Sequence, residues 1–278
     1  MMTGKRVLIT GPTSGIGKEI AVQLAALGAE VILACRDRER GNSIAEEITR
    51  RTGSKNCTIL QVDMASQRSI KGLVKNFKER YPRLDVLINN AGIHRSKREV
   101  NDAGVELTFA TNVLGYYYLT RELLDVLRAS APSRIVNVAS TYATDLDLTD
   151  LQFQHRSYKG SKAYAQSKAC DRMLTWAFAR RLEESGVTAN AMAPGLVQTG
   201  LYRNTPSSVR LILRMMGLFF GRSVEQGADT ALWLSSSPDV EGITGKFFER
   251  RKEVPCIFRN LEAEETLWRT CEGLTGIS

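Results

Sequence analysis

The sequence predicts an α/β protein built on a doubly wound parallel sheet with helices on both faces. Short apolar, β-rich runs alternate along the chain with longer amphipathic segments, which is the order of strand–helix–strand units. The apolar runs lack strict alternation with polar residues, as strands covered on both faces require. The chain has no linker-like stretch and no solenoid-type repeat, so a single domain over residues 1–278 is expected.

Each predicted element has its own signal in the sequence. The first helix carries Ile16, Ile20 and Leu24 as an apolar stripe, and Gly28 ends it. Right-handed crossovers place helices on both faces of a Rossmann-type sheet and ligands at the carboxyl ends of its strands. The predicted strands lie at residues 7–10, 31–34, 58–62, 86–88, 135–138, 188–192 and 246–248, and the later helices at about 40–52, 66–80, 103–129 and 161–184.

The composition is that of an ordinary soluble protein, with 43% hydrophobic and 24% charged residues. The formal net charge of +8 is spread along the chain, and runs such as 36–40 mix both signs, which argues against a nucleic-acid partner. Five cysteines without a CxxC pair and only two histidines argue against a metal site and favour reduced thiols in the cytoplasm. No signal peptide opens the chain, and the apolar run 211–220 is too short and too charged for a transmembrane segment.

A glycine-rich turn directly follows the first predicted strand. It reads Thr10-Gly11-Pro-Thr-Ser14-Gly15-Ile-Gly17 and opens an amphipathic helix. Glycines let the backbone approach a pyrophosphate, which the helix N-terminus then stabilises. A tight turn without a ligand is the alternative, but a strand before and a helix after are the context of a dinucleotide-binding βαβ unit.

The glycine spacing resembles the TGxxxGIG signature of short-chain dehydrogenases/reductases, and the resemblance covers nearly the whole chain. Asp63 is similar to the family residue that bonds the adenine ring, residues 89–92 resemble the NNAG motif, and residues 194–199 resemble the PGxxxT segment. The resemblance implies a nicotinamide dinucleotide cofactor. The cofactor-binding residues that it implies are Gly11, Thr13, Ser14, Gly15, Ile16, Gly17, Arg36, Asp63, Met64, Asn90, Ala91, Gly92, Tyr164, Lys168, Pro194, Gly195, Val197 and Thr199.

The end of the second predicted strand favours NADP(H) over NAD(H). Many NAD-binding folds carry an acidic residue here that bonds the ribose 2′-hydroxyl, whereas this sequence has Cys35 followed by Arg36. The missing carboxylate removes repulsion, and an arginine matches a 2′-phosphate. Some NADP-dependent relatives also carry a basic residue before the middle glycine, where this chain has Ser14. A plain surface role for Arg36 is the alternative.

Two tyrosine–lysine pairs, Tyr158 with Lys162 and Tyr164 with Lys168, have the four-residue step that places both side chains on one helix face. An ammonium near a phenol lowers the tyrosine pKa and lets the tyrosine exchange a proton with a substrate oxygen. Gly160 weakens the helix of the first pair, whereas the second pair stands in an unbroken helical pattern. The distance from the second pair to the later Pro-Gly motif also matches the family. We therefore predict Tyr164 and Lys168 as the catalytic pair, with Tyr158 in a longer connection beside the substrate pocket.

Two further polar residues complete the predicted catalytic set. Ser140 follows the fifth strand, where its hydroxyl faces the ligand crevice, and the family serine at this place holds the substrate oxygen. Thr141 is an adjacent alternative. Asn112 resembles the asparagine that anchors a water-linked proton relay. With Tyr164 and Lys168, these residues imply an oxidoreductase that interconverts a carbonyl and a primary or secondary alcohol.

An apolar, methionine-containing segment at about 200–222 is predicted to be a substrate lid, with ordinary packing or a shallow membrane contact as alternatives. Residues 34–37 and 267–277 resemble the retinol dehydrogenase-like branch. The chain starts shortly before its first strand, so the membrane anchor of many such relatives is not expected. These features favour a carbonyl reductase of the cytoplasm with an apolar small-molecule substrate. Self-association as a homodimer or homotetramer is expected only from the family.

Two other functions stay open at the level of sequence. One is NADPH-dependent reduction of an activated carbon–carbon double bond, and the other is dinucleotide sensing without turnover. The sequence leaves the identity of the substrate, the stereochemistry and the physiological direction undetermined.

Overall fold

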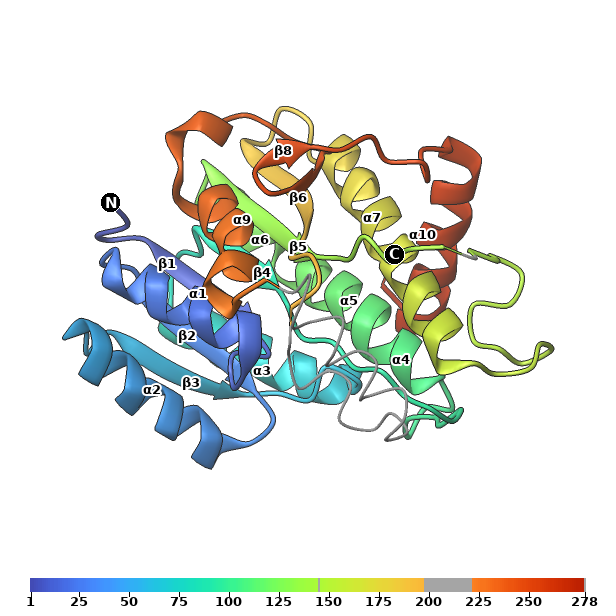
Figure 1. The fold of residues 1–278 in the computed structure, drawn as a ribbon, viewed down its shortest axis with the longest axis horizontal. Coiled ribbons are helices and arrows are strands. Elements are labelled where there is room, and N and C mark those ends of the chain that lie inside the picture. The colour runs from blue at the N-terminus through green and yellow to red at the C-terminus, as the bar shows by residue number, and fades with distance from the viewer. Residues whose placement is uncertain (145, 198–221, 278) are drawn as a thin grey trace.

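The computed structural model describes residues 1–144, 146–197 and 222–277. Within these ranges the strands form one eight-stranded sheet in the order β3-β2-β1-β4-β5-β6-β7-β8 (Figure 1). All neighbouring strands are parallel except β7 and β8, which pair antiparallel at one edge. The strands are β1 (Arg6–Thr10), β2 (Glu30–Cys35), β3 (Cys57–Gln61), β4 (Val86–Asn89), β5 (Ser133–Val138), β6 (Val187–Ala193), β7 (Phe247–Glu249) and β8 (Lys252–Glu253).

Helices cover both faces of this sheet, which confirms the predicted doubly wound α/β fold (Figure 1). Successive side chains of a strand point to opposite faces. On β1, Val7 and Ile9 therefore pack in one apolar cluster with α1, α2 and α9, while Leu8 packs in the other with α3, α5, α7 and α10. The helices are α1 (Gly15–Ala26), α2 (Arg38–Thr52), α3 (Gln67–Arg80), α4 (Leu107–Phe109), α5 (Gly115–Glu122), α6 (Leu124–Ala129), α7 (Gly160–Arg181), α9 (Val224–Ser236) and α10 (Leu261–Thr275), with a π-helical turn η1 (Ala110–Leu114) and a 3₁₀ turn η3 (Pro238–Val240).

The predicted helix at 103–129 is interrupted in the structure. Helix α4, the π turn η1, α5 and α6 follow one another over Leu107–Ala129. Gly115 lies against the loop after β3, and a Cβ there would approach the Met64 carbonyl oxygen within 2.6 Å. This close approach depends on a loop far away in the sequence, so periodicity along the helix did not reveal it.

Strand β8 and helices α9 and α10 were not predicted. Ser223 begins α9 with a capping box to Gln226, which is a local signal that the sequence does contain. Asn260 caps α10 by accepting a hydrogen bond from the Ala263 backbone N–H. The predicted lid at about 200–222 lies outside the described residues except for its last position. Across the described ranges, no helix combines the length and the apolar character that a membrane crossing requires.

Candidate active site

A cleft of about 510 Å³ opens at the carboxyl ends of β1, β2, β4, β5 and β6. This is the edge at which open α/β sheets bind ligands. Of the predicted site residues, Asn112 does not line the cleft, and Thr199 lies outside the described residues. The others all line it: Gly11, Thr13, Ser14, Gly15, Ile16, Gly17, Arg36, Asp63, Met64, Asn90, Ala91, Gly92, Ser140, Tyr164, Lys168, Pro194, Gly195 and Val197.

The glycine turn packs so closely on the loop after β4 that there is no room for a side chain at Gly11 or Gly17. Gly11 has a φ of 65°, and a Cβ there would meet the Ala91 Cα at 2.8 Å. A Cβ on Gly17 would meet the Asn90 Nδ2 at 2.3 Å. That Nδ2 donates to the Thr10 and Gly11 carbonyl oxygens at 2.9 and 3.1 Å. The side-chain amide of Asn90 therefore connects the glycine turn after β1 to the loop after β4, the neighbouring strand in the sheet.

The N-terminus of α1 fits an anionic group of a dinucleotide. The helix begins at Gly15, and the preceding Ser14 makes no side-chain capping hydrogen bond. Both residues line the cleft. Backbone N–H groups of an uncapped first turn are donors for a phosphate, and the helix dipole favours negative charge there. The turn therefore fits the pyrophosphate of a dinucleotide.

Two arginines lie where β2 ends in the cleft. Arg36 is exposed, and Arg40 comes from the first turn of α2. The nearby Asp37 is committed elsewhere, because its carboxylate accepts from the Arg40 backbone N–H at 3.0 Å and pairs with the Arg40 Nε at 3.2 Å. Arg40 was not predicted from the sequence. Its position four residues after Arg36, at the start of a predicted helix, could have indicated it.

Tyr164 and Lys168 lie inside α7 and reach the cleft between the ends of β4 and β5. Tyr164 is 7% exposed and Lys168 is 3% exposed. The Lys168 Nζ donates to the Val138 carbonyl oxygen at 2.9 Å and pairs with the Asp171 Oδ2 at 2.8 Å. It lies 5.9 Å from the centroid of the Tyr164 ring. Asp171 was not among the predicted site residues.

The pKa of Tyr164 is raised, in contrast to the sequence-based expectation of a lowered pKa. Burial is the largest cause, the interaction with the Ser140 side chain lowers the pKa, and the negative charge of Asp171 raises it further. The sequence pattern placed an ammonium near the phenol. It did not reveal that a buried carboxylate would neutralise this ammonium.

Ser140 lies just after β5, and two hydrogen bonds hold it there. Its Oγ accepts from the Tyr142 backbone N–H at 3.0 Å, and its carbonyl oxygen accepts a hydrogen bond from the Arg172 guanidinium. Arg172 stacks on the Phe247 ring, with its Cζ 3.7 Å from the ring centroid. Helix α7 and strand β7 therefore jointly fix the backbone of Ser140, whose side chain also interacts with Tyr164.

Asn112 lies in the π turn η1 and is 0% exposed. Its Oδ1 accepts from the Ile93 backbone N–H at 2.9 Å, and its Nδ2 donates to the Ile93 carbonyl oxygen at 3.1 Å. The same Nδ2 donates to the Ser167 Oγ at 3.0 Å. These bonds tie the loop after β4 to α7. The predicted role of Asn112 in a water relay stays a prediction.

Tyr158 lies outside the lining of the cleft. It precedes the first residue of α7, Gly160, so it is not on one helical face with Lys162. Its hydroxyl donates to the Glu106 Oε1 at 3.0 Å, and it lies 3.2 Å from the Thr108 Oγ1. The structure therefore places Tyr158 in a polar contact with the start of α4.

His94 is a cleft residue that no sequence motif indicated. It lies two residues after the NNAG-like segment, and its ring centroid lies 6.1 Å from that of Tyr164. The side chain is 9% exposed, and burial lowers its pKa. A neutral imidazole therefore faces the region in which a substrate would meet Tyr164.

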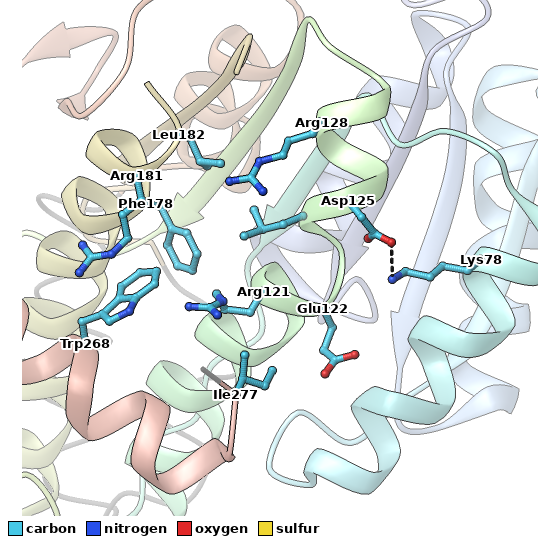
Figure 2. Close-up of a pocket in the computed structure, with 11 residues that line it drawn as sticks. Lys78, Arg121, Glu122, Asp125, Arg128, Phe178, Arg181, Leu182, Trp268 and Ile277 are labelled. Carbon is cyan, nitrogen blue, oxygen red and sulfur yellow. Dashed lines mark hydrogen bonds and ion pairs between the residues drawn. The ribbon is translucent and has the colours of Figure 1, made fainter. Parts of the chain in front are cut away.

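A second cavity of about 500 Å³ lies between α3, α5, α6, α7 and α10 (Figure 2). Phe178 and Trp268 form its apolar wall. Its cations largely face acids: the Lys78 Nζ lies 2.8 Å from the Asp125 Oδ2, and Arg121 lies 3.4 Å from a Glu272 oxygen. It contains neither the glycine turn nor the tyrosine–lysine pair, so the chemistry belongs to the first cleft.

The comparisons with known proteins agree with this geometry. The family model described as short chain dehydrogenase matches residues 5–209. Human retinol dehydrogenase 14 is 36% identical over 296 aligned positions, which cover 100% of this chain and 88% of that protein.

Two solved structures share the fold. A protein from Mycobacterium paratuberculosis has a TM-score of 0.77 at 28% identity, covering 99% of this chain and 94% of that one. The RhlG/NADP active-site complex of Pseudomonas aeruginosa has a TM-score of 0.71 at 26% identity, covering 89% and 94%. Enzymes of this family use nicotinamide dinucleotides and act on small molecules. Since the family match spans most of the chain and its relatives include retinol dehydrogenases, the chain belongs to the short-chain dehydrogenase family and is an oxidoreductase.

Proposed function

We propose that the protein is an NADP(H)-dependent enzyme that interconverts a carbonyl and a primary or secondary alcohol on an apolar small molecule. The observation that carries this proposal is the convergence of Ser140, Tyr164 and Lys168 on the same cleft as the glycine turn and Arg36. Proton transfer, orientation of a substrate oxygen and binding of a dinucleotide are thereby brought together on one edge of the sheet.

A nicotinamide dinucleotide supplies the hydride to a carbonyl carbon, or takes it from an alcohol carbon, when it is bound. The chain's own residues orient the substrate oxygen and transfer its proton. Tyr164 gives its hydroxyl proton to the carbonyl oxygen in reduction, and the Ser140 hydroxyl orients that oxygen. The Lys168 ammonium lies close to Gly92 in the loop after β4 and would bond the ribose of a bound cofactor.

Support for NADP(H) comes from Arg36 and Arg40, which both line the cleft at the end of β2. Guanidinium groups match a phosphate with paired hydrogen bonds. The structurally similar RhlG protein has NADP in its active-site complex.

Support for an apolar substrate comes from the retinol dehydrogenases among the relatives. A long-chain or polyene aldehyde, together with the corresponding alcohol, is therefore the first substrate class to test. Ketones and enones complete the panel, and enones test the alternative of carbon–carbon double-bond reduction.

The experiment follows the loss of dihydronicotinamide absorbance with this panel. Tyr164→Phe removes the proton donor and is expected to lower turnover by at least about a hundredfold, since general acid catalysis contributes that much or more. Binding of NADPH, followed by its fluorescence, should remain close to that of the wild type. Tyr158→Phe is the matched control, because its hydroxyl lies outside the cleft, and it should retain turnover. Full activity of Tyr164→Phe, or no reaction with any carbonyl, would contradict the proposal.

A further inference from the structure

Asp171 lies one helical turn beyond Lys168 on α7 and belongs to no predicted motif. Its Oδ2 lies 2.8 Å from the Lys168 Nζ, and the two side chains are 0% and 4% exposed. Among the described residues, its second oxygen, Oδ1, has no hydrogen-bond partner. A fully buried ion pair therefore lies directly behind the proposed reacting centre.

The ion pair restricts where Lys168 can act. An ammonium has three hydrogens, and two of them have acceptors in the Asp171 carboxylate and the Val138 carbonyl oxygen, which lies 2.9 Å away. The remaining side of the Nζ faces the loop after β4, where a Cβ on Gly92 would lie 3.9 Å from it. The Nζ also lies 5.2 Å from the centroid of the Tyr116 ring. Asp171 and Val138 therefore hold the lysine at the cleft, beside Tyr116 and Gly92.

The carboxylate also determines the charge that Tyr164 experiences. Burial is the largest influence on the pKa of Lys168 and lowers it, but the interactions with Asp171 and Tyr116 together outweigh burial. The net shift is upward, so the ammonium stays protonated. Burial raises the pKa of Asp171 to about 6, with Lys168 acting in the opposite direction, so the carboxylate is ionised at neutral pH. The two opposite charges lie 2.8 Å apart, so the carboxylate offsets the effect of the ammonium on the phenol, and its charge is one of the causes that raise the pKa of Tyr164.

We propose that Asp171 is a positioning residue that neutralises Lys168 and keeps Tyr164 protonated, so that the site favours reduction of a carbonyl over oxidation of an alcohol. The inference rests on the proposed function. In reduction, the Tyr164 O–H bond breaks and its proton joins the carbonyl oxygen, while the hydride of the reduced cofactor joins the carbonyl carbon. In oxidation, the phenolate must take the alcohol proton. A protonated Tyr164 can therefore act as the proton donor in reduction, but it cannot accept the alcohol proton in oxidation.

The other titratable groups near Asp171 come from three helices. Besides Lys168 and Tyr164, its charge acts on Cys170 of α7, Tyr116 of α5 and Cys271 of α10, and burial raises the pKa of each of these three groups. All three are uncharged at neutral pH. Strand β5 contributes only a backbone carbonyl to the pair. Asp171 is therefore the negative charge that balances Lys168.

The test measures the ionisation of Tyr164 directly by ¹³C NMR of labelled tyrosine, with the signal assigned through Tyr164→Phe. No substrate or turnover is needed, so the result does not depend on the proposed activity. In Asp171→Asn, which keeps an oxygen acceptor for Lys168, Tyr164 should titrate at a pH lower than in the wild type by about one unit or more. If this variant does not fold by circular dichroism, Asp171→Ser replaces it as the neutral variant.

Two controls retain the relevant charge. Asp171→Glu keeps the carboxylate and should titrate like the wild type, and so should Asp125→Asn, which removes a carboxylate from the distant second cavity. A Tyr164 signal that titrates in Asp171→Asn at the wild-type pH or above, or that does not move up to the highest pH at which the variant stays folded, would overturn the inference.

The direction of catalysis is tested by a pH profile. For alcohol oxidation, kcat/KM should rise with pH as Tyr164 ionises, and the midpoint should lie about one unit or more lower in Asp171→Asn. An unchanged midpoint despite an NMR shift would refute the directional part. If the wild type turns over no alcohol or carbonyl at all, the proposed function fails, and the NMR titration still decides the role of Asp171.

Discussion

The proposed cofactor preference depends on two single residues at the end of β2, Arg36 and Arg40. Both line the cleft, and the carboxylate of Asp37, which is also at the end of β2, already caps α2 and pairs with Arg40. An acidic residue that would bond a ribose 2′-hydroxyl is replaced by Cys35. The local charge therefore favours an additional phosphate.

Replacing Arg36 should separate the two cofactors. A charge-assisted hydrogen bond contributes about 1.5–3 kcal/mol, so Arg36→Ala should raise the KM for NADPH about tenfold or more and leave the KM for NADH nearly unchanged. Steady-state kinetics with each cofactor measures the ratio. Arg38→Ala is the matched control, because Arg38 is exposed at the start of α2 and outside the cleft lining. Equal changes for NADPH and NADH in Arg36→Ala would contradict the preference.

At the scale of elements, α10 covers the face of α7 that points away from the cleft. Trp268 packs edge-on against Phe178 of α7 and Tyr117 of α5, with ring centroids 5.0 and 4.9 Å apart. Leu267 and Cys271 are 0% exposed in the same cluster. Because α7 carries Tyr164, Lys168 and Asp171, this packing supports the helix that holds the proposed reacting groups.

Truncating the buried face of α10 should destabilise the whole protein. Leu267→Ala leaves a cavity and is expected to lower the free energy of unfolding by about 2–5 kcal/mol. Leu261→Ala, on the same helix but 61% exposed, should change it by less than about 0.5 kcal/mol. Urea denaturation followed by circular dichroism measures both. Equal effects of the two substitutions would show that α10 does not pack on α7 as described.

At the scale of the whole molecule, Asp85 joins the starts of the central strands β1 and β4. Its side chain is 2% exposed and accepts from the Lys5 Nζ at 3.0 Å, the Arg6 backbone N–H at 2.9 Å and the Arg83 Nε at 3.1 Å. Burial alone would raise its pKa, but the bonds from Arg83, Arg6 and Lys5 outweigh burial, and the pKa is lowered. The carboxylate therefore stabilises the folded state only while it is ionised.

The contribution of Asp85 to stability should depend on pH. Its folded-state pKa lies below the unfolded value of about 3.9, so the stabilisation is fully present above that pH and is lost as the pH falls through the folded pKa. Asp85→Asn should lower the free energy of unfolding by about 1–3 kcal/mol at neutral pH and by progressively less in acid. Asp102→Asn, at an exposed position, should have little effect at any pH. A deficit of Asp85→Asn that stays constant into acid would contradict this account.

The sequence by itself determined the α/β fold and the positions of the seven strands β1 to β7 along the chain, and it predicted the site residues, whose roles stay predictions. These features rest on local signals: apolar runs, the glycine turn before α1, and the four-residue step from Tyr164 to Lys168. Each of these signals depends only on residues that are close together in the sequence, so it can be recognised in a single sequence. The organisation as one domain stays a prediction, as does self-association.

Only the tertiary structure decided the electrostatics of the site. Asp171 is three residues from Lys168 in the sequence, but its effect depends on α5, α7 and α10 together excluding water from the pair. The close approach of Gly115 to Met64 and the contact between Asn112 and Ile93 likewise depend on loops that are distant along the chain. Burial determines which side chains stay charged and which pKa values are shifted. Burial depends on how the elements pack together and cannot be inferred from a local sequence pattern.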